Sequence, residues 1–272
     1  MRADRQGILR RGWPSSPGGG WSGRVLGKCL CVAAVLAAWA CASAIGTFPP
    51  DVLPSVPAVF GAFVGDLHTS AFWAAVSATL AAACIGLVAA IVVGVPLGLL
   101  TGSYAAAERS TRLLVDAGRS FPVIALLPVM LLLLGTTTTM KSWVVFLACL
   151  FPLFLQAQYG ARSVAPTIAE TVRSYRIPRL LRFRKVVLPS ATPSIMTGLR
   201  LAATTSVLVS VAVEILTTLP GLGQHIISDE TANSPAAAFS YILAAGLIGY
   251  AVSRLCQIAE RHFLRWRPPP AR

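Results

Sequence analysis

The sequence contains few charged residues. Asp, Glu, Lys and Arg make up 12% of its 272 residues, whereas soluble domains have roughly 25%. Hydrophobic residues make up 55%, and the mean hydropathy is +0.70. Such a composition excludes a disordered chain, a small disulfide scaffold and almost any soluble enzyme. It predicts a polytopic membrane protein.

Motifs for catalysis, cofactors and metals are also missing. There is no His-Glu-x-x-His zinc motif and no Gly-x-Ser-x-Gly nucleophile turn. Residues 18–24 have the glycine spacing of a phosphate-binding loop, but Arg24 replaces the lysine and Val25 the serine or threonine. We therefore expect no catalysis, no cofactor and no metal site. The six cysteines lie in or beside apolar runs and are predicted to be small buried hydrophobic residues: Cys29, Cys31, Cys41, Cys84, Cys149 and Cys256.

Long apolar runs account for most of the chain. A helix needs about 20 apolar residues to cross a bilayer core about 30 Å thick. The runs lack the alternation of barrel strands, so we expect helices. The predicted fold class is an all-α polytopic membrane protein with about six transmembrane helices. The expected spans lie near residues 29–45, 72–100, 121–135, 143–159, 197–219 and 236–256.

The positive charges lie almost entirely on one side of this arrangement. Apart from Lys141, every Lys and Arg falls in or beside the termini and the connections after the second and fourth spans. Because Lys and Arg accumulate on cytoplasmic loops, both termini are predicted to be cytoplasmic, in a multi-pass protein of the inner (cytoplasmic) membrane. This orientation explains the net charge of +13 without a nucleic acid partner.

The N-terminal region allows two interpretations. Residues 1–24, rich in Gly, Ser, Pro and Arg, are predicted to be a disordered basic cytoplasmic tail. Residues 25–66 are then a first transmembrane helix and its external loop. Alternatively, the arginines, the apolar run and the Ala-rich residues 40–44 describe a cleavable signal peptide, whose removal would leave five spans.

The basic stretch between the fourth and fifth spans is the most informative part of the sequence. Thr167 and Glu170 have the spacing of a helix-capping box, so a helix is expected to start there. Pro178 is expected to break it, and a second short helix is expected to end at Pro189 and Pro193 before the fifth span. Such an amphipathic segment either lies on anionic lipid or docks a cytosolic protein.

Within residues 165–189, Glu170 is followed six positions later by Arg176, and Leu188-Pro189 stand at the far end. This spacing resembles the EAA loop of permease subunits of binding-protein-dependent ABC importers, which begins Glu-Ala-Ala, continues to a glycine and ends in Leu-Pro. Other stretches resemble the nitrate, sulfonate and taurine branch of these permeases: residues 53–57, 96–102, 121–122, 125–128, Glu214 with 220–223, and 259–261.

The resemblance implies a type I ABC importer transmembrane domain over residues 67–257, followed by a cytoplasmic tail, residues 258–272. It also implies a homodimeric pore, cytosolic ATPase subunits that grip the EAA-like segment, and an extracytoplasmic solute-binding protein. The implied solute is a small nutrient such as nitrate, a sulfonate or taurine. The residues implied in ATPase coupling are Glu170, Val172, Arg173, Arg176, Pro178, Arg179, Arg182, Leu188 and Pro189.

Arg176 departs from the family's pattern, which has glycine at this position. Glycine lets the chain turn with positive φ at little steric cost, and arginine does not. We therefore expect Ile177-Pro178 to supply the bend by another route. The two alanines of the pattern are Thr171 and Val172 here. These departures leave open a divergent partner ATPase or a degenerate subunit.

Glu214 is an acid within an expected span. An acid at the centre of a transmembrane helix costs about 2.5–3.5 kcal/mol, so it is expected to face a cavity, a dimer contact or the outer mouth rather than lipid. A permeation role, interhelical bonding and a position at the helix end remain open. The resemblance implies a translocation path that includes Glu214, Gly221 and Gly223. Three prolines are predicted to kink helices: Pro96, Pro122 and Pro128.

The predicted function is that of an ABC importer permease, which moves a small solute with energy supplied by a partner ATPase. The alternative is a secondary transporter or channel that works alone. That alternative predicts inverted repeats or intramembrane charge pairs. The sequence shows no such repeat and only one acid in the middle of a span, which favours the permease.

Overall fold

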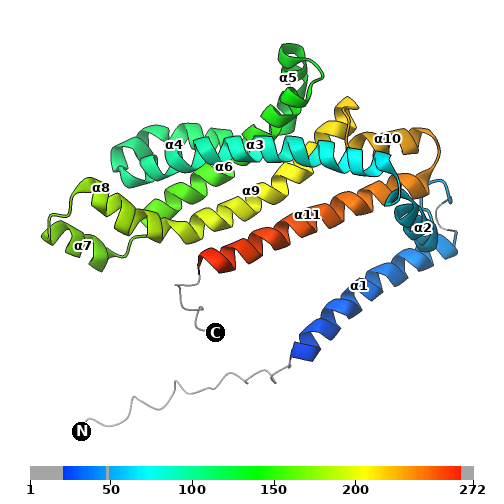
Figure 1. Cartoon of the computed structure of the whole chain (residues 1–272), viewed down its shortest axis with the longest axis horizontal. Coiled ribbons are helices and arrows are strands. Elements are labelled where there is room, and N and C mark those ends of the chain that lie inside the picture. Colours follow the sequence, from blue (N-terminus) through cyan, green and yellow to red (C-terminus); the bar gives the residue numbers. More distant parts are fainter. Residues whose placement is uncertain (1–20, 47–48, 265–272) are drawn as a thin grey trace, which may run out of the picture. The chain divides into compact units, whose positions relative to one another are not determined.

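The computed structural model describes residues 21–46 and 49–264, and every regular element in these ranges is helical (Figure 1). The chain divides into two units, Met1–Val56 and Pro57–Arg272, which are described separately. Residues 1–20 of the predicted N-terminal tail and residues 265–272 of the predicted C-terminal tail lie outside the described ranges.

The first unit contains one helix, α1 (Trp21–Ala44). It begins at Trp21, earlier than the expected start at residue 25. Its Trp39 indole N–H donates a hydrogen bond to the Pro54 carbonyl at 3.1 Å. Leu30 and Val35 are largely exposed, so α1 presents an apolar surface of the kind that suits lipid.

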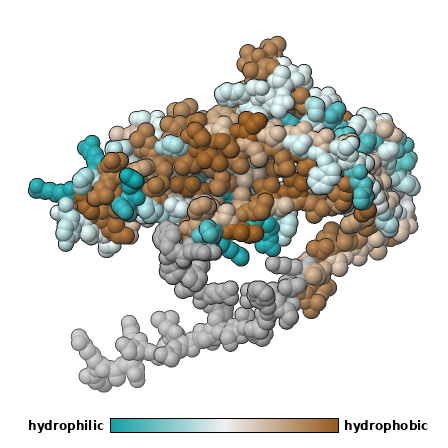
Figure 2. Space-filling model, in the orientation of Figure 1, coloured by the Kyte–Doolittle hydropathy of each residue, from teal (hydrophilic) through white to brown (hydrophobic). Residues whose placement is uncertain are grey.

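Four long helices form the body of the second unit: α3 (Ser70–Ser103), α6 (Thr138–Arg162), α9 (Leu188–Thr217) and α11 (Pro235–Phe263). Each is long and apolar enough to cross a membrane. They confirm the predicted second, fourth, fifth and sixth spans. Helix α9 packs against the other three. Figure 2 shows hydrophobic atoms over the middle of the long helices and hydrophilic atoms toward their ends.

The expected third span, near residues 121–135, is helical only over residues 123–134, which is too short to cross a membrane without the helix before it. The chain forms α4 (Ala105–Ser120), a short 3₁₀ turn η1 (Val123–Leu126) and α5 (Leu127–Leu134). The bend across this break is 84°. Pro122 explains it, because proline has no N–H to donate and forces the preceding residue into an extended conformation. The described residues hold four candidate spans, or five with the bent pair, and two shorter apolar helices, Cys29–Ala44 and Val56–Asp66.

The other two prolines predicted to kink helices, Pro96 and Pro128, lie within helices and not between them. Pro96 lies inside α3, which continues to Ser103. Pro128 lies in the first turn of α5, where proline removes no helical hydrogen bond. Of the three, only Pro122 stands at a break between helices.

A stripe of glycines brings α3 close to α6. A Cβ atom at Gly98 would lie 2.3 Å from the Phe154 carbonyl oxygen, and one at Gly86 would lie 2.7 Å from the Ser142 carbonyl oxygen. Small residues at such positions let two helix backbones approach, which is a common way of packing helices in membranes. This close contact fixes the positions of the ends of α6. Lys141, which pairs with Glu214, lies near one end, and residues 165–189 follow the other.

Short helices lie at opposite ends of the long ones (Figure 1). At one end are α7 (Pro166–Ser174) and α8 (Arg179–Arg182), and a π turn, η2 (Phe183–Val187), joins α8 to α9. At the other end, α2 (Val56–Asp66) and α10 (Leu222–Thr231) lie near an apolar cluster formed by α3, α10 and α11. That cluster includes Phe72, Leu222, Ile226 and Tyr241.

Candidate functional site

Helix α7 begins without the predicted capping box. Its N-cap residue is Ala165, which has no capping side chain, and Pro166 is the first helical residue. Proline suits this position, because its missing N–H would have no partner there. Thr167 therefore lies inside the helix, and its expected reciprocal bond with Glu170 is wrong.

The turn after α7 is built around Arg176. The Arg176 N–H donates to the Arg173 carbonyl at 3.1 Å. The Ile177 N–H donates to the Val172 carbonyl, also at 3.1 Å. These two bonds around a residue of positive φ form the Schellman motif that commonly ends helices.

Arg176 itself has φ 50°, the left-handed conformation that usually belongs to glycine. The expectation that arginine avoids this turn is therefore wrong. The two backbone hydrogen bonds offset the steric cost of its Cβ atom.

The helix that follows was expected to end at Pro189 and Pro193, but it continues past both. From Arg179 to Thr217 the chain is continuously helical over 39 residues. Pro189 lies in the first turn of α9, and Pro193 lies inside it. The π turn η2 comes directly before Pro189. Because wider turns of this kind relieve the clash between proline and the preceding turn, the helix continues.

Most residues of the coupling segment, as we name residues 165–189, are exposed. Apolar side chains are among them: Tyr175 is 79% exposed and Leu180 is 70% exposed. Arg179 and Arg182 line a cavity of about 570 Å³ together with residues at the end of α3. Of the residues predicted to couple to an ATPase, only Val172 is buried, and these are exposed: Glu170, Arg173, Arg176, Pro178, Arg179, Arg182 and Leu188.

Glu214 lies at the opposite end of α9 and is 0% exposed. Its Oε1 accepts hydrogen bonds from Lys141 Nζ at 2.9 Å and from Ser210 Oγ at 3.4 Å. Its Oε2 accepts from Thr79 Oγ1 at 3.0 Å and from the Gly223 N–H at 2.9 Å. The donors belong to α3, α6, α9 and α10. We name these five residues the corner clamp.

Lys141 is the residue that the sequence analysis missed. Local sequence patterns mark it only as an exception to the charge distribution. Its side chain is 2% exposed, and it also donates to the Ala78 carbonyl at 3.3 Å and the Pro220 carbonyl at 3.1 Å. An ammonium group has three donors, and all three are used. The chain therefore contains a buried charge pair that local sequence patterns did not reveal.

Two predicted glycines complete this corner. Gly221 has φ 154°, and a Cβ atom there would lie 2.1 Å from Glu214 Cδ. A Cβ atom at Gly223 would lie 2.4 Å from the Val211 carbonyl oxygen. Both positions therefore exclude a side chain. The structure brings the three residues predicted for the translocation path, Glu214, Gly221 and Gly223, into one contact group.

Beside the corner clamp, α10 carries a partly buried acid. Burial raises the pKa of the Asp229 carboxyl above its ordinary value of 3.8. The negative charge of Asp66 acts in the same direction, and His225 opposes it. His225 also stacks on Tyr241 of α11, with 4.7 Å between the ring centroids.

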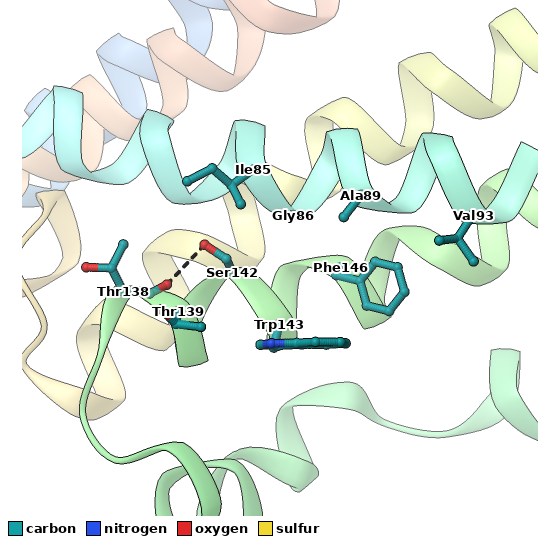
Figure 3. Close-up of a pocket in the computed structure, with 9 residues that line it drawn as sticks. All are labelled: Ile85, Gly86, Ala89, Val93, Thr138, Thr139, Ser142, Trp143 and Phe146. Carbon is teal, nitrogen blue, oxygen red and sulfur yellow. Dashed lines mark hydrogen bonds between the residues drawn. The ribbon is translucent and has the colours of Figure 1, made fainter.

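A separate groove lies between α3 and α6 (Figure 3). It has a volume of about 310 Å³ and is lined mainly by apolar side chains, among them Ile85, Val93, Trp143 and Phe146. No Asp, Glu, Lys or Arg lines it. Its walls suit an apolar group.

The comparisons with known proteins agree with this architecture. Residues 94–265 match the family described as "Binding-protein-dependent transport system inner membrane component". The chain is 29% identical to the putative aliphatic sulfonates transport permease protein SsuC of Escherichia coli, over 86% of this chain and 89% of that protein. It is 28% identical to the nitrate import permease protein NrtB of Leptolyngbya laminosa, over 68% of this chain and 66% of that protein.

A further relative is named for a different solute. The chain is 31% identical to the formylaminopyrimidine transport permease protein ThiX of Halalkalibacterium halodurans, over 74% of this chain and 81% of that protein. The fold resembles a chain of the inward-facing MetNI methionine ABC transporter, with a TM-score of 0.61 and 19% identity, over 68% of this chain and 93% of that one.

The family match covers the whole of α6, α9 and α11, the end of α3, the coupling segment and the corner clamp from Lys141 onward. The chain is a membrane-spanning permease, and ATP hydrolysis takes place in a separate subunit. This overturns the alternative of a transporter or channel that works alone. The chain belongs to the family of inner membrane components of binding-protein-dependent transport systems.

Proposed function

We propose that two copies of this chain form the pathway of an ABC importer for a small nutrient with an oxyanion group, such as nitrate, a sulfonate or taurine. The observation that carries the proposal is the similarity, over most of the chain, to permeases named for aliphatic sulfonates and nitrate. The relative named for formylaminopyrimidine supplies the competing solute class.

The solute class is tested in the native cells. We expect cells that lack the gene for this chain to lose uptake of at least one of labelled nitrate, taurine or a linear alkanesulfonate. A plasmid copy of the gene should restore that uptake. Unchanged uptake of all three anions, or a loss confined to a formylaminopyrimidine, would contradict the oxyanion proposal and leave the family assignment intact.

We further propose that the coupling segment docks on a cytosolic ATPase subunit, with both termini on the same side of the membrane. Its exposed face mixes arginines with apolar side chains such as Ile168, Tyr175 and Leu180. A surface that only lay on lipid would separate these two kinds of side chain more completely. Exposed apolar groups beside arginines are typical of the centre of protein interfaces.

Co-purification tests this docking. The wild-type chain, tagged and extracted in mild detergent, is expected to retain an ATPase with a nucleotide-binding P-loop. A variant with Arg179, Arg182 and Lys185 changed to Glu should lose it, because three reversed charges face the same partner. Arg261→Glu, an exposed charge reversal at the end of α11, is the matched control. Equal ATPase recovery from the triple variant and the control would show that the segment merely lies on lipid.

A further inference from the structure

We propose that Lys141 is a positioning residue for transport: through the corner clamp it makes the corner between α9 and α10 move as one body with α3 and α6. This inference rests on the proposed function, because it assigns a part in transmitting the ATPase's movement. It concerns a residue that does not contact solute, since all three of its donors are used within the chain.

The clamp ties together elements that meet at a non-helical corner. Between α9 and α10 the backbone passes through Thr218 at φ 53° and Gly221 at φ 154°. Glycine adopts the conformation of Gly221 at little steric cost. Lys141 restrains the corner by bonding at once to the Ala78 carbonyl of α3 and the corner's Pro220 carbonyl.

The carboxylate of Glu214 restrains the start of α10 directly. The first N–H groups of a helix have no partner within it. Here the Gly223 N–H donates to Glu214 Oε2, and the Leu222 N–H donates to Thr79 Oγ1 at 3.0 Å. A negative charge at a helix N-terminus is favourable. Glu214 on α9 and Thr79 on α3 therefore cap α10 from outside, and Lys141 holds Glu214 in place.

A buried ion pair by itself is weak evidence for stability, because removing two charges from water offsets most of their attraction. The better-supported use of such pairs is to select one arrangement over others. In this chain the pair is saturated with hydrogen bonds, and no buried side-chain nitrogen or oxygen in the described ranges lacks a partner. In this chain, the arrangement that the pair selects is the orientation of α10.

The position of the clamp links it to the coupling segment. Arg179 and Thr217 are the two ends of one continuous helical stretch of 39 residues, which spans about 58 Å at 1.5 Å per residue. A displacement of α8 therefore reaches the corner through α9. Helix α10 also packs in the apolar cluster with α3 and α11. The clamp adds side-chain hydrogen bonds from α3, α6 and α9 to the start of α10 and to the corner before it, so we expect the clamp to set how closely α10 follows α9.

The test measures coupling rather than stability. The complex of this chain with its ATPase and binding protein is reconstituted in liposomes, and solute uptake is divided by ATP hydrolysed. We compare Thr79→Val, Lys141→Met, and Lys141→Met combined with Glu214→Leu. We expect each to assemble with the ATPase and hydrolyse ATP, but to move roughly tenfold less solute per ATP, within the usual range of coupling between two sites.

Three comparisons separate positioning from folding and from simple ion pairing. Thr217→Val is matched to Thr79→Val, because Thr217 is also buried but bonds only within its own helix; we expect the wild-type ratio. The double apolar variant leaves no unpaired charge, so it folds even where Lys141→Met does not. Exchanging the two charges, Lys141→Glu with Glu214→Lys, restores an ion pair but points an ammonium group at the start of α10, so we expect no rescue.

A wild-type ratio in Thr79→Val and in the double apolar variant would overturn the proposal, and so would full rescue by the charge exchange. If the wild-type complex itself takes up none of the proposed anions or retains no ATPase, that result contradicts the proposed function. It does not contradict the positioning role of Lys141. The two failures are therefore distinguishable.

Discussion

Replacing Arg176 with glycine is expected to stabilise the turn after α7. A left-handed conformation costs an L-residue roughly 1–2 kcal/mol, and Arg176 adopts it with φ 50°. Glycine removes this cost but gives the unfolded chain extra freedom worth about 0.5–1 kcal/mol. The difference is a net gain of about 0.5–1 kcal/mol, which corresponds to roughly a two- to fivefold smaller population of the opened turn.

The measurement is hydrogen–deuterium exchange at the Ile177 amide, whose bond to the Val172 carbonyl closes the turn. Exchange should slow two- to fivefold in Arg176→Gly, in line with that free energy. It should not slow in Arg176→Ala, which removes the charge but keeps the strained Cβ atom. Arg173→Gly, inside α7, should speed exchange, because glycine costs about 1 kcal/mol in a helix. Equal slowing in the alanine and glycine variants would refute the backbone explanation.

Further predictions concern packing and pH. Gly98→Ala should lower the thermal unfolding midpoint of the purified protein, because its Cβ would lie 2.3 Å from the Phe154 carbonyl oxygen. Such overpacking costs about 1–3 kcal/mol. The control variant Gly246→Ala should not lower the midpoint, because a Cβ atom there would have nothing within 4 Å. Burial raises the pKa of Asp229, which means that the folded protein favours the protonated carboxyl. The stability that this protonated carboxyl contributes is full below pH 3.8 and is lost as pH rises through the raised pKa. Asp229→Asn should therefore raise the midpoint at neutral pH, and the gain should vanish in acid; a gain independent of pH would refute this cause.

The four long spans could be predicted because span length and apolarity are local properties of the sequence. Helices α3, α6, α9 and α11 each contain a run of the expected length. The third span could not be predicted in the same way. Its composition is equally apolar, and the break at Pro122 is decided by backbone geometry, which hydropathy does not measure.

Two errors in the coupling segment share a cause. Propensity treats Arg176 as a residue that avoids positive φ, and Pro189 as a residue that ends helices. In the structure, two backbone hydrogen bonds stabilise the first, and a π turn accommodates the second. Both solutions depend on neighbouring backbone atoms rather than on residue type, so a single-residue rule cannot anticipate them.

The pairing of Lys141 with Glu214 lay beyond local patterns, because the two residues are 73 positions apart. The sequence nevertheless held a signal for it. Lys141 was the one positive charge on the predicted outer side, and Glu214 was an acid in a span that ends on that side. Since an isolated charge in the membrane is costly, two such exceptions of opposite sign at one end of the bundle favour a pair.

The continuous helical stretch from Arg179 to Thr217 lies between two left-handed residues. Arg176 comes shortly before it, and Thr218 directly follows it. The two boundaries are held by different contacts. The first rests on exposed backbone hydrogen bonds, and the second on the buried corner clamp. Effects at sites that share no partner usually add. Combining Arg176→Gly with Thr79→Val should therefore slow exchange at the Ile177 amide as the first variant does and lower the solute moved per ATP as the second does. Non-additive effects would mean that the two boundaries are energetically coupled through the helix between them.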